Sequence, residues 1–263
     1  MQKLIIKGKK KLSGSINISG SKNATLPILA ATLLTDKTII LKNTPFVQDV
    51  YTMINLLKFI GLSIKISKKL NTLKISSKRK LKTIAPYKLL KTMRAGVLVL
   101  GPLLAKCKKA KVSLPGGCAI GTRPVNLHLF ALNKLGAKIK IKNGYIHATA
   151  ENGLKGAIIK FPSISVGATE SAILAAVSAS GKTIISNCAI EPEIQDMIFF
   201  LKKMGCNINF IGKRKISIIG IKKFRILKHE IIFDRIELGT YLIAAALVGK
   251  KIIFLKIKPK IIE

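Results

Sequence analysis

An internal repeat constrains the fold of this chain more than any other feature. LPILAATLLTDKTIILKN at residues 26–43 returns as SAILAAVSASGKTIISN at 171–187 and as YLIAAALVGKKIIF at 241–254, with a looser copy at 97–114. Each copy begins with an apolar, alanine-rich helical segment and continues into a short strand. The period of about 70 residues is longer than that of a solenoid repeat, so each unit is expected to be a self-sufficient block of secondary structure.

The second half of each block has its own signature. NLLKFIGLSIKI, FALNKLGAKIKI and FFLKKMGCNINF each end an apolar helical pattern at a glycine and continue with alternating apolar residues. Glycine directly after the last apolar turn is typical of a helix C-terminus, which places Gly61, Gly136 and Gly205 at three helix ends. Three complete blocks are therefore predicted between Gly20 and Ile232, and a fourth begins near Asp234 and stops after its first strand. The fold class is α/β.

Composition limits the classes of protein. With 263 residues and 49% hydrophobic residues, the chain is long and apolar enough for one large domain or two small ones. No N-terminal leader pattern and no uncharged stretch long enough to span a bilayer are present, so a cytoplasmic location without a membrane partner is expected. The four cysteines, Cys107, Cys118, Cys188 and Cys206, show neither C-x-x-C pairs nor histidines at ligand spacing. Reduced thiols, no metal site and no cofactor are expected.

The net charge of +36 raises the possibility of nucleic-acid binding, because clustered lysine and arginine release counterions from phosphate backbones. The lysines are scattered through almost every segment, however, and tryptophan is absent, so stacking platforms for bases are few. This distribution indicates a compositional bias in which arginine survives where its two-pronged geometry is needed. A specific nucleic-acid partner is not expected, although a remnant that binds nucleotide or RNA through charge is kept as an alternative function.

The segment LPGGCAIGTRPVNLHL at residues 114–129 carries the strongest chemical signal. Its glycines favour a mobile loop around Cys118, and a thiol on such a loop can act as an acid or a nucleophile. Arg123 can lower the pKa of the thiol or bind an anionic substrate. The alternative is a buried structural cysteine beside a glycine-rich turn, since free cysteine is among the most buried residue types.

This loop resembles that of the UDP-N-acetylglucosamine 1-carboxyvinyltransferases, a family of enolpyruvyl transferases. The resemblance runs from about Lys3 to the last residue and includes the motifs ISGSKNATLPILAATLL, MRAGVLVLGPLLA, SVGATESAILAA, EPEIQD and DRIELGTYLIAAA. It implies an inside-out α/β fold with two three-block domains and an active site in the cleft between them. By this comparison, residues 22–233 form a complete first domain, residues 1–21 supply the first strand of the second domain, and residues 234–263 begin that domain, which is C-terminally truncated.

The resemblance also implies a reaction and its residues. The family transfers the enolpyruvyl group of phosphoenolpyruvate to the 3-hydroxyl of UDP-N-acetylglucosamine, with release of phosphate, in the first committed step of peptidoglycan synthesis. Cys118 matches the proton donor that can also bond covalently to the reactant, and Lys22, Asn23 and Arg123 match the phosphoenolpyruvate contacts. The matches to the sugar-nucleotide site are Arg94, Arg123, Pro124, Val125, Asn126, Leu127, Ser163, Ile164, Ser165 and Val166.

Some positions depart from the family pattern. Asn126 replaces a frequent aspartate and Ser163 a frequent lysine, which predicts weaker sugar-nucleotide binding. The family's base for the sugar hydroxyl lies in the missing domain, so the chain alone is expected to be inactive unless a separate polypeptide supplies that domain. The shikimate-pathway enolpyruvyl transferase, which lacks the cysteine loop, is a less favoured alternative.

The remaining polar residues are expected to be structural. His128 is interpreted as a helix residue bonded to a nearby carbonyl, and His147 and His229 as surface residues. The carboxylates of EPEIQD at 191–196 fit either a helix N-terminus, which is favoured, or a paired-acid site. SVGATESAIL at 165–174 lacks the spacing of a nucleoside-triphosphatase phosphate loop, although its backbone amides can still meet a phosphate.

Overall fold

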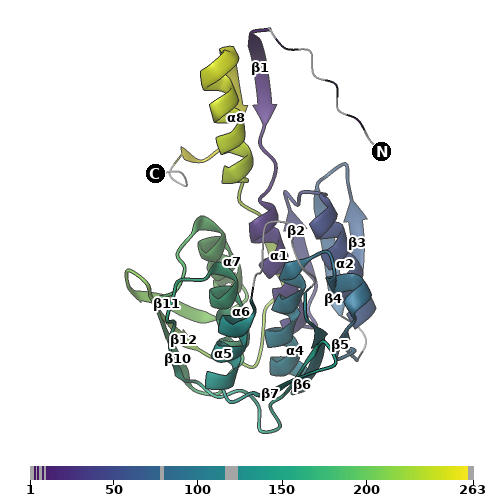
Figure 1. Ribbon diagram of the computed structural model, residues 1–263, viewed down its shortest axis with the longest axis vertical. Helices are drawn as coiled ribbons and strands as arrows, with labels where there is room; N and C mark the ends of the chain where they lie inside the picture. The colour runs from purple at the N-terminus through teal and green to yellow at the C-terminus, as the bar shows by residue number, and fades with distance from the viewer. Residues whose placement is uncertain are drawn as a thin grey trace.

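Three copies of one block of helices and strands, with a smaller unit attached, make up the structure (Figure 1). The computed structural model describes residues 3, 5, 8, 10–77, 80–115 and 124–259. The first block comprises α1 (Lys22–Ala31), η1 (Thr32–Leu34), β2 (Ile39–Lys42), α2 (Gln48–Ile60), β3 (Leu62–Ser67) and β4 (Thr72–Ser77). The second comprises β5 (Ile84–Ala85), α3 (Tyr87–Leu90), η2 (Arg94–Val99), α4 (Leu100–Cys107), β6 (Lys109–Ser113), α5 (Asn126–Lys134), β7 (Lys138–Lys142) and β8 (Tyr145–Thr149).

The third block and the attached unit complete the chain. The block comprises β9 (Ile158–Lys160), α6 (Val166–Ala176), β10 (Lys182–Ser186), α7 (Pro192–Lys203), β11 (Asn207–Gly212) and β12 (Lys215–Ile219), followed by β13 (Leu227–Glu230). The unit comprises β1 (Leu12–Asn17), α8 (Arg235–Val248) and β14 (Gly249–Leu255). The sequence-predicted repeat of helix and strand is thus confirmed at all four places.

The three larger sheets share one topology. Their strand orders are β13-β2-β4-β3, β5-β6-β8-β7 and β9-β10-β12-β11. In each sheet, the strand that follows the apolar helix pairs antiparallel with one neighbour and parallel with a strand from outside the helix–strand repeat. For the first sheet that parallel strand is β13, which comes from the end of the third block. The chain therefore returns to its start and closes the three blocks into one body.

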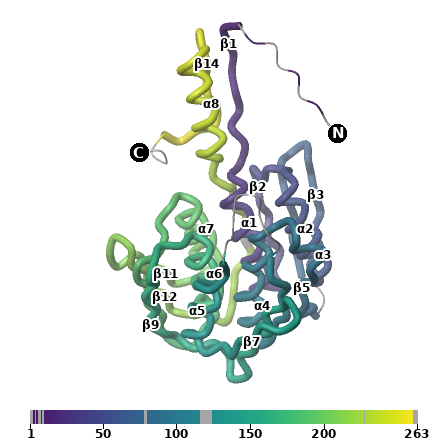
Figure 2. The backbone as a smooth tube through the Cα atoms, in the orientation of Figure 1, coloured from purple at the N-terminus to yellow at the C-terminus, as the bar shows by residue number. Residues whose placement is uncertain are grey.

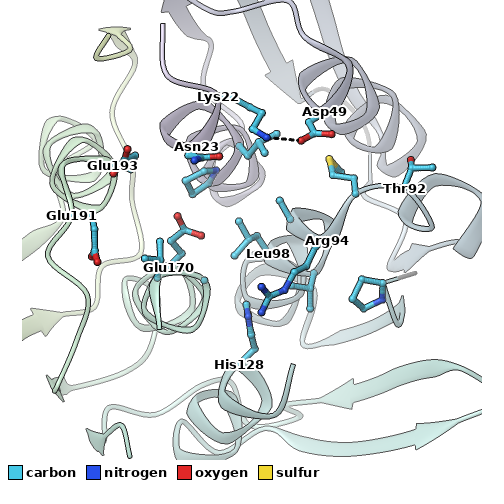
Figure 3. Close-up of a pocket in the computed structure, with 18 of the residues that line it drawn as sticks. Lys22, Asn23, Asp49, Thr92, Arg94, Leu98, His128, Glu170, Glu191 and Glu193 are labelled. Atoms are coloured by element: carbon cyan, nitrogen blue, oxygen red, sulfur yellow. Dashed lines mark ion pairs between the residues drawn. The ribbon is translucent and has the colours of Figure 1, made fainter. Parts of the chain in front are cut away.

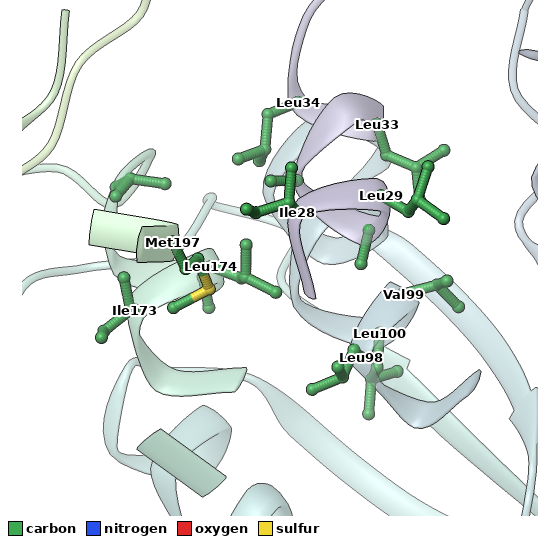
Figure 4. Packing of buried hydrophobic residues seen from close by; sticks show 14 of the residues in the cluster. Ile28, Leu29, Leu33, Leu34, Leu98, Val99, Leu100, Ile173, Leu174 and Met197 are labelled. Atoms are coloured by element: carbon green, nitrogen blue, oxygen red, sulfur yellow. The ribbon is translucent and has the colours of Figure 1, made fainter. Parts of the chain in front are cut away.

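Helices fill the interior and the sheets lie outside them (Figures 1 and 2). Every residue from Ala24 to Ala31 of α1 is buried, as is every residue from Ala168 to Ala176 of α6. A helix that is apolar all round has to be covered on every side, and the small alanine side chains allow its neighbours to approach closely. Figure 4 shows Ile28 and Leu29 of α1 packed among residues of the other two blocks, including Leu98, Leu174 and Met197. This inside-out α/β arrangement agrees with the predicted fold class.

The ends of the repeated elements use residues that adopt positive φ. Gly61, Gly136 and Gly205 have φ values of 130°, 91° and 100°, which confirms the three predicted helix ends. Asn43 and Asn187 follow β2 and β10 with φ values of 54° and 56°. The side-chain amide of Asn43 donates to the carbonyl of Ile231 at 2.9 Å, and that of Asn187 to Phe161 at 3.0 Å. The same local device is thus repeated in the first and third blocks.

The attached unit is a parallel pair, β1 and β14, with α8 beside it (Figures 1 and 2). Two connections run next to each other between this unit and the blocks, since the Ser21 amide bonds the Ile232 carbonyl at 2.7 Å and the Asp234 amide bonds the Ser19 carbonyl at 2.8 Å. The assignment of 1–21, 22–233 and 234–263 to separate domains stays a prediction. Within the described residues, no helix combines the length and the apolar character needed to cross a bilayer.

Candidate active site

A cavity of about 890 Å³ opens among the apolar helices near the start of α1 (Figure 3). Its walls come from α1, α2, η2, α5 and α6, together with the starts of α7 and α8. The polar and charged residues that line it are Lys22, Asn23, Asp49, Lys91, Thr92, Arg94, His128, Glu170, Glu191, Glu193 and Arg235. Residues from all three blocks and from the attached unit therefore meet at one place.

The N-terminus of α1 brings Lys22 and Asn23 to the cavity. The hydroxyl of Ser21 caps the helix by accepting a hydrogen bond from the Ala24 amide at 3.3 Å. Pro27 lies inside the helix and has no N–H to bond the carbonyl of Asn23, four residues earlier. The start of α1 thus presents a lysine and an asparagine to the cavity within its first turn.

Lys22 is paired in this structure. Its Nζ lies 3.0 Å from Oδ2 of Asp49, which comes from the first turn of α2, and both side chains are partly exposed. An exposed ion pair of this kind contributes little to stability, about 0–1 kcal/mol, so it can be exchanged for another anion at low cost. Lys22 is therefore available to a phosphate or carboxylate group that enters the cavity.

Arg94 and Pro124 lie on the wall formed by the second block. Nη2 of Arg94 donates to the Pro124 carbonyl at 3.4 Å, which joins the start of η2 to the segment before α5. Pro115 lines the same cavity. The described residues on both sides of the segment 116–123 are therefore at the site, whereas Cys118 and Arg123 themselves lie outside the described residues.

His128 is buried in the first turn of α5 and is neutral. Its Nδ1 lies 2.7 Å from Oγ of Ser171, and its Nε2 has no hydrogen-bond partner among the described residues. Burial, with a smaller contribution from the positive charge of Arg94, lowers the pKa of His128 to about 4. A Cβ on Gly167 would lie 2.9 Å from the imidazole ring, so glycine at that position leaves room for it. The predicted partner was a carbonyl, and the structure places a hydroxyl there instead.

Three glutamates face the basic residues across the cavity (Figure 3). Glu193 accepts two hydrogen bonds from Arg235, at 2.9 and 3.2 Å, while Glu191 precedes it on the same segment. Glu170 of α6 is only 6% exposed. Burial, and then the nearby charge of Glu193, raises the pKa of Glu170 to about 8 against the opposing effect of Arg94.

The structure places some of the predicted site residues at the cavity and others away from it. The five that line the cavity are Lys22, Asn23, Arg94, Pro124 and Val166. The side chain of Val125 is buried, that of Leu127 packs against the core, and the Ser165 hydroxyl caps α6 by accepting from the Ala168 amide. The other three, which are exposed and do not line the cavity, are Asn126, Ser163 and Ile164.

The structure corrects the interpretation of His229 as a surface residue. His229 is 1% exposed in β13, and its Nε2 lies 3.1 Å from Oδ1 of Asp196. The other oxygen of Asp196 accepts from the Ile232 amide at 3.3 Å. His147 is half-buried on β8, so it too is less exposed than predicted.

The EPEIQD segment is more than a helix start. Glu193 does lie in the first turn of α7, as expected, but no side chain caps that helix. The carboxylate of Glu193 instead accepts hydrogen bonds from Arg235, and the carboxylate of Asp196 lies beside the imidazole of His229. The two partners come from β13 and from the start of α8, which local sequence patterns do not connect to α7.

Sequence analysis missed Glu170 and Arg235 as cavity residues. Two signals were available. Glu170 is the one charged residue in the apolar stretch of α6, and Arg235 is one of few arginines in a chain rich in lysine. The structure shows why an arginine stands at position 235, since its guanidinium bonds both oxygens of Glu193, a two-pronged contact that lysine cannot make. No three described histidine, cysteine, aspartate or glutamate residues form a group suited to a metal ion.

Comparisons with known proteins give the family of the chain. The chain is 60% identical over 263 residues to a UDP-N-acetylglucosamine 1-carboxyvinyltransferase of Pelagibacter ubique (strain HTCC1062), covering all of this chain and 63% of that protein. It is 53% identical over 260 residues to the protein of the same name from Endomicrobium trichonymphae, covering 99% of this chain and 62% of that protein. The chain thus spans about three fifths of the length of these curated relatives.

Solved structures share the fold at low sequence identity. The enolpyruvyl transferase NikO from Streptomyces tendae superposes with a TM-score of 0.79 at 19% identity, covering 92% of this chain and 57% of that chain. An EPSP synthase from Acinetobacter baumannii also gives a TM-score of 0.79, at 18% identity, and the match covers 97% of this chain and 58% of that chain. The sequence profile of the EPSP synthase family matches residues 6–263. The chain therefore belongs to the EPSP synthase (3-phosphoshikimate 1-carboxyvinyltransferase) family, and its curated relatives within that family are UDP-N-acetylglucosamine 1-carboxyvinyltransferases.

Proposed function

We propose that this chain takes part in the transfer of the enolpyruvyl group from phosphoenolpyruvate to the 3-hydroxyl of UDP-N-acetylglucosamine, with release of phosphate. The observation that carries the proposal is the convergence of Lys22, Asn23, Arg94, Pro124 and Val166 on one cavity, although they come from three different blocks. The names of the relatives that share up to 60% identity with the chain support the same reaction. The reaction would be the first committed step of peptidoglycan synthesis in the cytoplasm, on which cell shape and cell division depend.

Each residue has a chemical task in this proposal. Cys118 donates a proton to the methylene carbon of phosphoenolpyruvate and can also bond to the reactant, and Lys22, Asn23 and Arg123 bind that substrate. Arg94 and Arg123, with the segments 124–127 and 163–166, hold the sugar nucleotide. Positive charge on Lys22 and the arginines would stabilise the phosphate as it leaves. Because Asp49 pairs with Lys22 at 3.0 Å, an incoming anion has to share or displace that contact.

The catalytic base for the sugar hydroxyl is proposed to come from the region of the relatives that this chain does not span, present in the same polypeptide or in a separate one. The attached unit offers a surface for that region. Most apolar side chains of α8 are exposed, including Ile243 at 65% and Leu247 at 77%, and β1 and β14 pair only with each other among the described residues. Large exposed apolar patches of this kind mark interaction sites.

A phosphate-release assay tests the activity. The purified 263-residue chain is supplied with phosphoenolpyruvate and UDP-N-acetylglucosamine, alone and with a polypeptide that corresponds to the remaining part of the Pelagibacter ubique relative. Loss of one general base costs about 10²–10⁴-fold, and loss of substrate positioning adds to this, so release is expected only with the second polypeptide. Robust release from the chain alone would contradict the assignment of the base, and absence of release in both mixtures would contradict the proposed function.

The cysteine provides a second test. Cys188 and Cys206 are buried, Cys107 is half-buried, and burial raises the pKa of all three thiols, that of Cys206 to about 12. Brief exposure to maleimide followed by peptide mapping should therefore label Cys118 first, and Arg123→Ala should slow that labelling. Equal labelling of all four cysteines would count against a special thiol.

A further inference from the structure

Glu170 stands out as a nearly buried acid that lines the cavity. It lies in α6, is 6% exposed, and makes no hydrogen bond with any described residue. Figure 3 shows its carboxyl group directed into the cavity, between Asn23 and His128. Its carboxyl oxygens are not among the described side-chain atoms that are both shielded from solvent and without a partner, so they are open to the cavity, where a polar group of a ligand can bond them.

The charged groups around Glu170 differ in whether they are paired. The titratable and charged side chains that line the cavity with it are Lys22, Asp49, Lys91, Arg94, His128, Glu191, Glu193 and Arg235. Four of these charges are already paired, because Asp49 pairs with Lys22 and Arg235 pairs with Glu193. His128 is neutral, as argued above from its low pKa. Burial and the two neighbouring glutamates raise the pKa of Glu170 to about 8, so near pH 7 its carboxyl carries a proton.

The cavity is accordingly divided. Lys22, Lys91 and Arg94 offer positive charge on one side, which suits the phosphate and carboxylate groups of the proposed substrates. Glu170, Glu191 and Glu193 lie on the other side, where Arg235 pairs with Glu193, so that side is less favourable to those groups. The uncharged part of a bound ligand is therefore expected to lie against the glutamate wall, where a protonated carboxyl can donate one hydrogen bond and accept another.

A second unsatisfied group lies on the same cavity. His128 is 3% exposed, its Nδ1 is held by Ser171, and its Nε2 has no hydrogen-bond partner among the described residues. Ser171 is the residue that follows Glu170 in α6, so one helix turn presents Glu170 to the cavity and fixes the histidine. The cavity is therefore lined by two neutral groups that can still form hydrogen bonds, the Glu170 carboxyl and Nε2 of His128.

We propose that Glu170 is an uncharged hydrogen-bond donor to the sugar of a bound sugar nucleotide, an inference that rests on the proposed function. The hydroxyl and acetamido groups of an N-acetylated hexosamine have the acceptor oxygens that a carboxylic acid requires. Glu170 then distinguishes the sugar nucleotide from the free nucleotide, which has no sugar to meet it. It is a specificity residue rather than one that transfers protons in the reaction.

Calorimetric titration of the whole chain with UDP-N-acetylglucosamine and with UDP tests this directly. Glu170→Leu should weaken the binding of UDP-N-acetylglucosamine about tenfold, the value of one good hydrogen bond. The affinity for UDP should stay within about twofold of that of the natural chain. Glu170→Gln, which keeps a neutral donor and an acceptor, should stay within about threefold for both ligands. Glu151→Gln, which removes an exposed glutamate in a turn, serves as the matched control.

The pH dependence gives an independent readout if Glu170→Leu does not fold. Affinity of the natural chain for UDP-N-acetylglucosamine should fall as the pH rises through about 8, because Glu170 loses its proton, while Glu170→Gln should show no such fall. In the free protein, the ¹³C signal of the Glu170 carboxyl should titrate near the same pH. Titration of this signal in the ordinary range of an exposed glutamate would overturn the inference whatever the ligand does.

The outcomes separate the two proposals. If UDP binds and Glu170→Leu weakens both ligands equally, or neither, the sugar contact is wrong and the proposed function stands. If the natural chain binds neither UDP nor UDP-N-acetylglucosamine, the sugar-nucleotide site itself is contradicted and the contact proposed for Glu170 falls with it.

Discussion

The first and last copies of the repeat have similar sequences and opposite surroundings. In α1, the run P-I-L-A-A is buried on every side, whereas in α8 the run L-I-A-A-A is largely exposed and Leu238 is the buried residue of the helix. Ile28 is 0% exposed, and Ile243, at the matching place in the motif, is 65% exposed. The comparison teaches that local sequence suffices to specify this helix–strand unit but not the burial of its apolar face.

Local interactions explain why α8 forms at all. Asp234 caps it by accepting hydrogen bonds from the amides of Ile236 and Glu237 at 2.9 and 3.0 Å. Glu237 lies in the first turn, where negative charge is favourable, and alanine and leucine are strong helix formers. These effects involve only residues within a few positions of one another, so they do not depend on neighbours that cover the helix. A side chain also caps α1, where Ser21 accepts from the Ala24 amide, although α1 has no acidic residue in its first turn.

The largest difference between the two copies should appear in apolar truncations. Ile28→Ala in α1 should lower the free energy of unfolding by about 2–5 kcal/mol, because a buried side chain is removed and a cavity remains. Ile243→Ala in α8 should change it by less than about 0.5 kcal/mol. Urea denaturation of the two variants measures both values. A loss of several kcal/mol for Ile243→Ala would break the comparison, since it would show that another surface, such as a second copy of the chain, covers α8 in solution.

A smaller effect is expected at the contact that joins the two regions. Arg235→Met should lower the free energy of unfolding by about 1–3 kcal/mol, because it leaves the buried carboxylate of Glu193 without its two hydrogen bonds. Lys106→Met is the control, since it breaks the more exposed pair with Asp36 and should cost less than about 1 kcal/mol. Thermal denaturation measures the loss of free energy of unfolding in both variants. Equal losses would contradict this expectation.

The smallest effect concerns the residues of positive φ that follow the repeated strands. Asn187→Ala should cost about 1–2 kcal/mol, because alanine is strained at a φ of 56° and the hydrogen bond to Phe161 is lost. Lys256 follows β14 with a φ of 61°, and its side chain makes no hydrogen bond of that kind with the described residues, so Lys256→Ala should be nearly neutral. Guanidinium unfolding curves compare the pair, and equal costs would show that strain rather than the amide contact dominates.

Much of the fold could be predicted from short-range patterns. The helix ends at Gly61, Gly136 and Gly205 depend on a backbone conformation that glycine adopts easily, and the structure has all three in it. Likewise, Lys22, Asn23 and Arg94 were predicted from motifs, and the structure brings them to one cavity. The functions assigned to them, and to Cys118 and Arg123 outside the described residues, stay predictions.

The charge arrangement of the site could not be predicted in the same way. Glu193 and Arg235 are 42 positions apart, and His229 reaches Asp196 across a similar separation. Each of these residues, judged by its neighbours in the chain, resembles a solvent-exposed helix or strand residue. Only the tertiary structure brings Arg235 and His229 to the two buried carboxylates of α7.

The sequence by itself determined the repeated helix–strand unit, its ends and the family motifs, because these depend on side-chain periodicity and on backbone preferences within a few residues. Tertiary structure alone decided which copy of the unit is buried, which carboxylates are paired, and that Glu170 is left without a partner in the cavity. The physical reason is that burial and electrostatic pairing are set by groups brought together from distant parts of the chain, whereas a local pattern fixes only the face that an element presents.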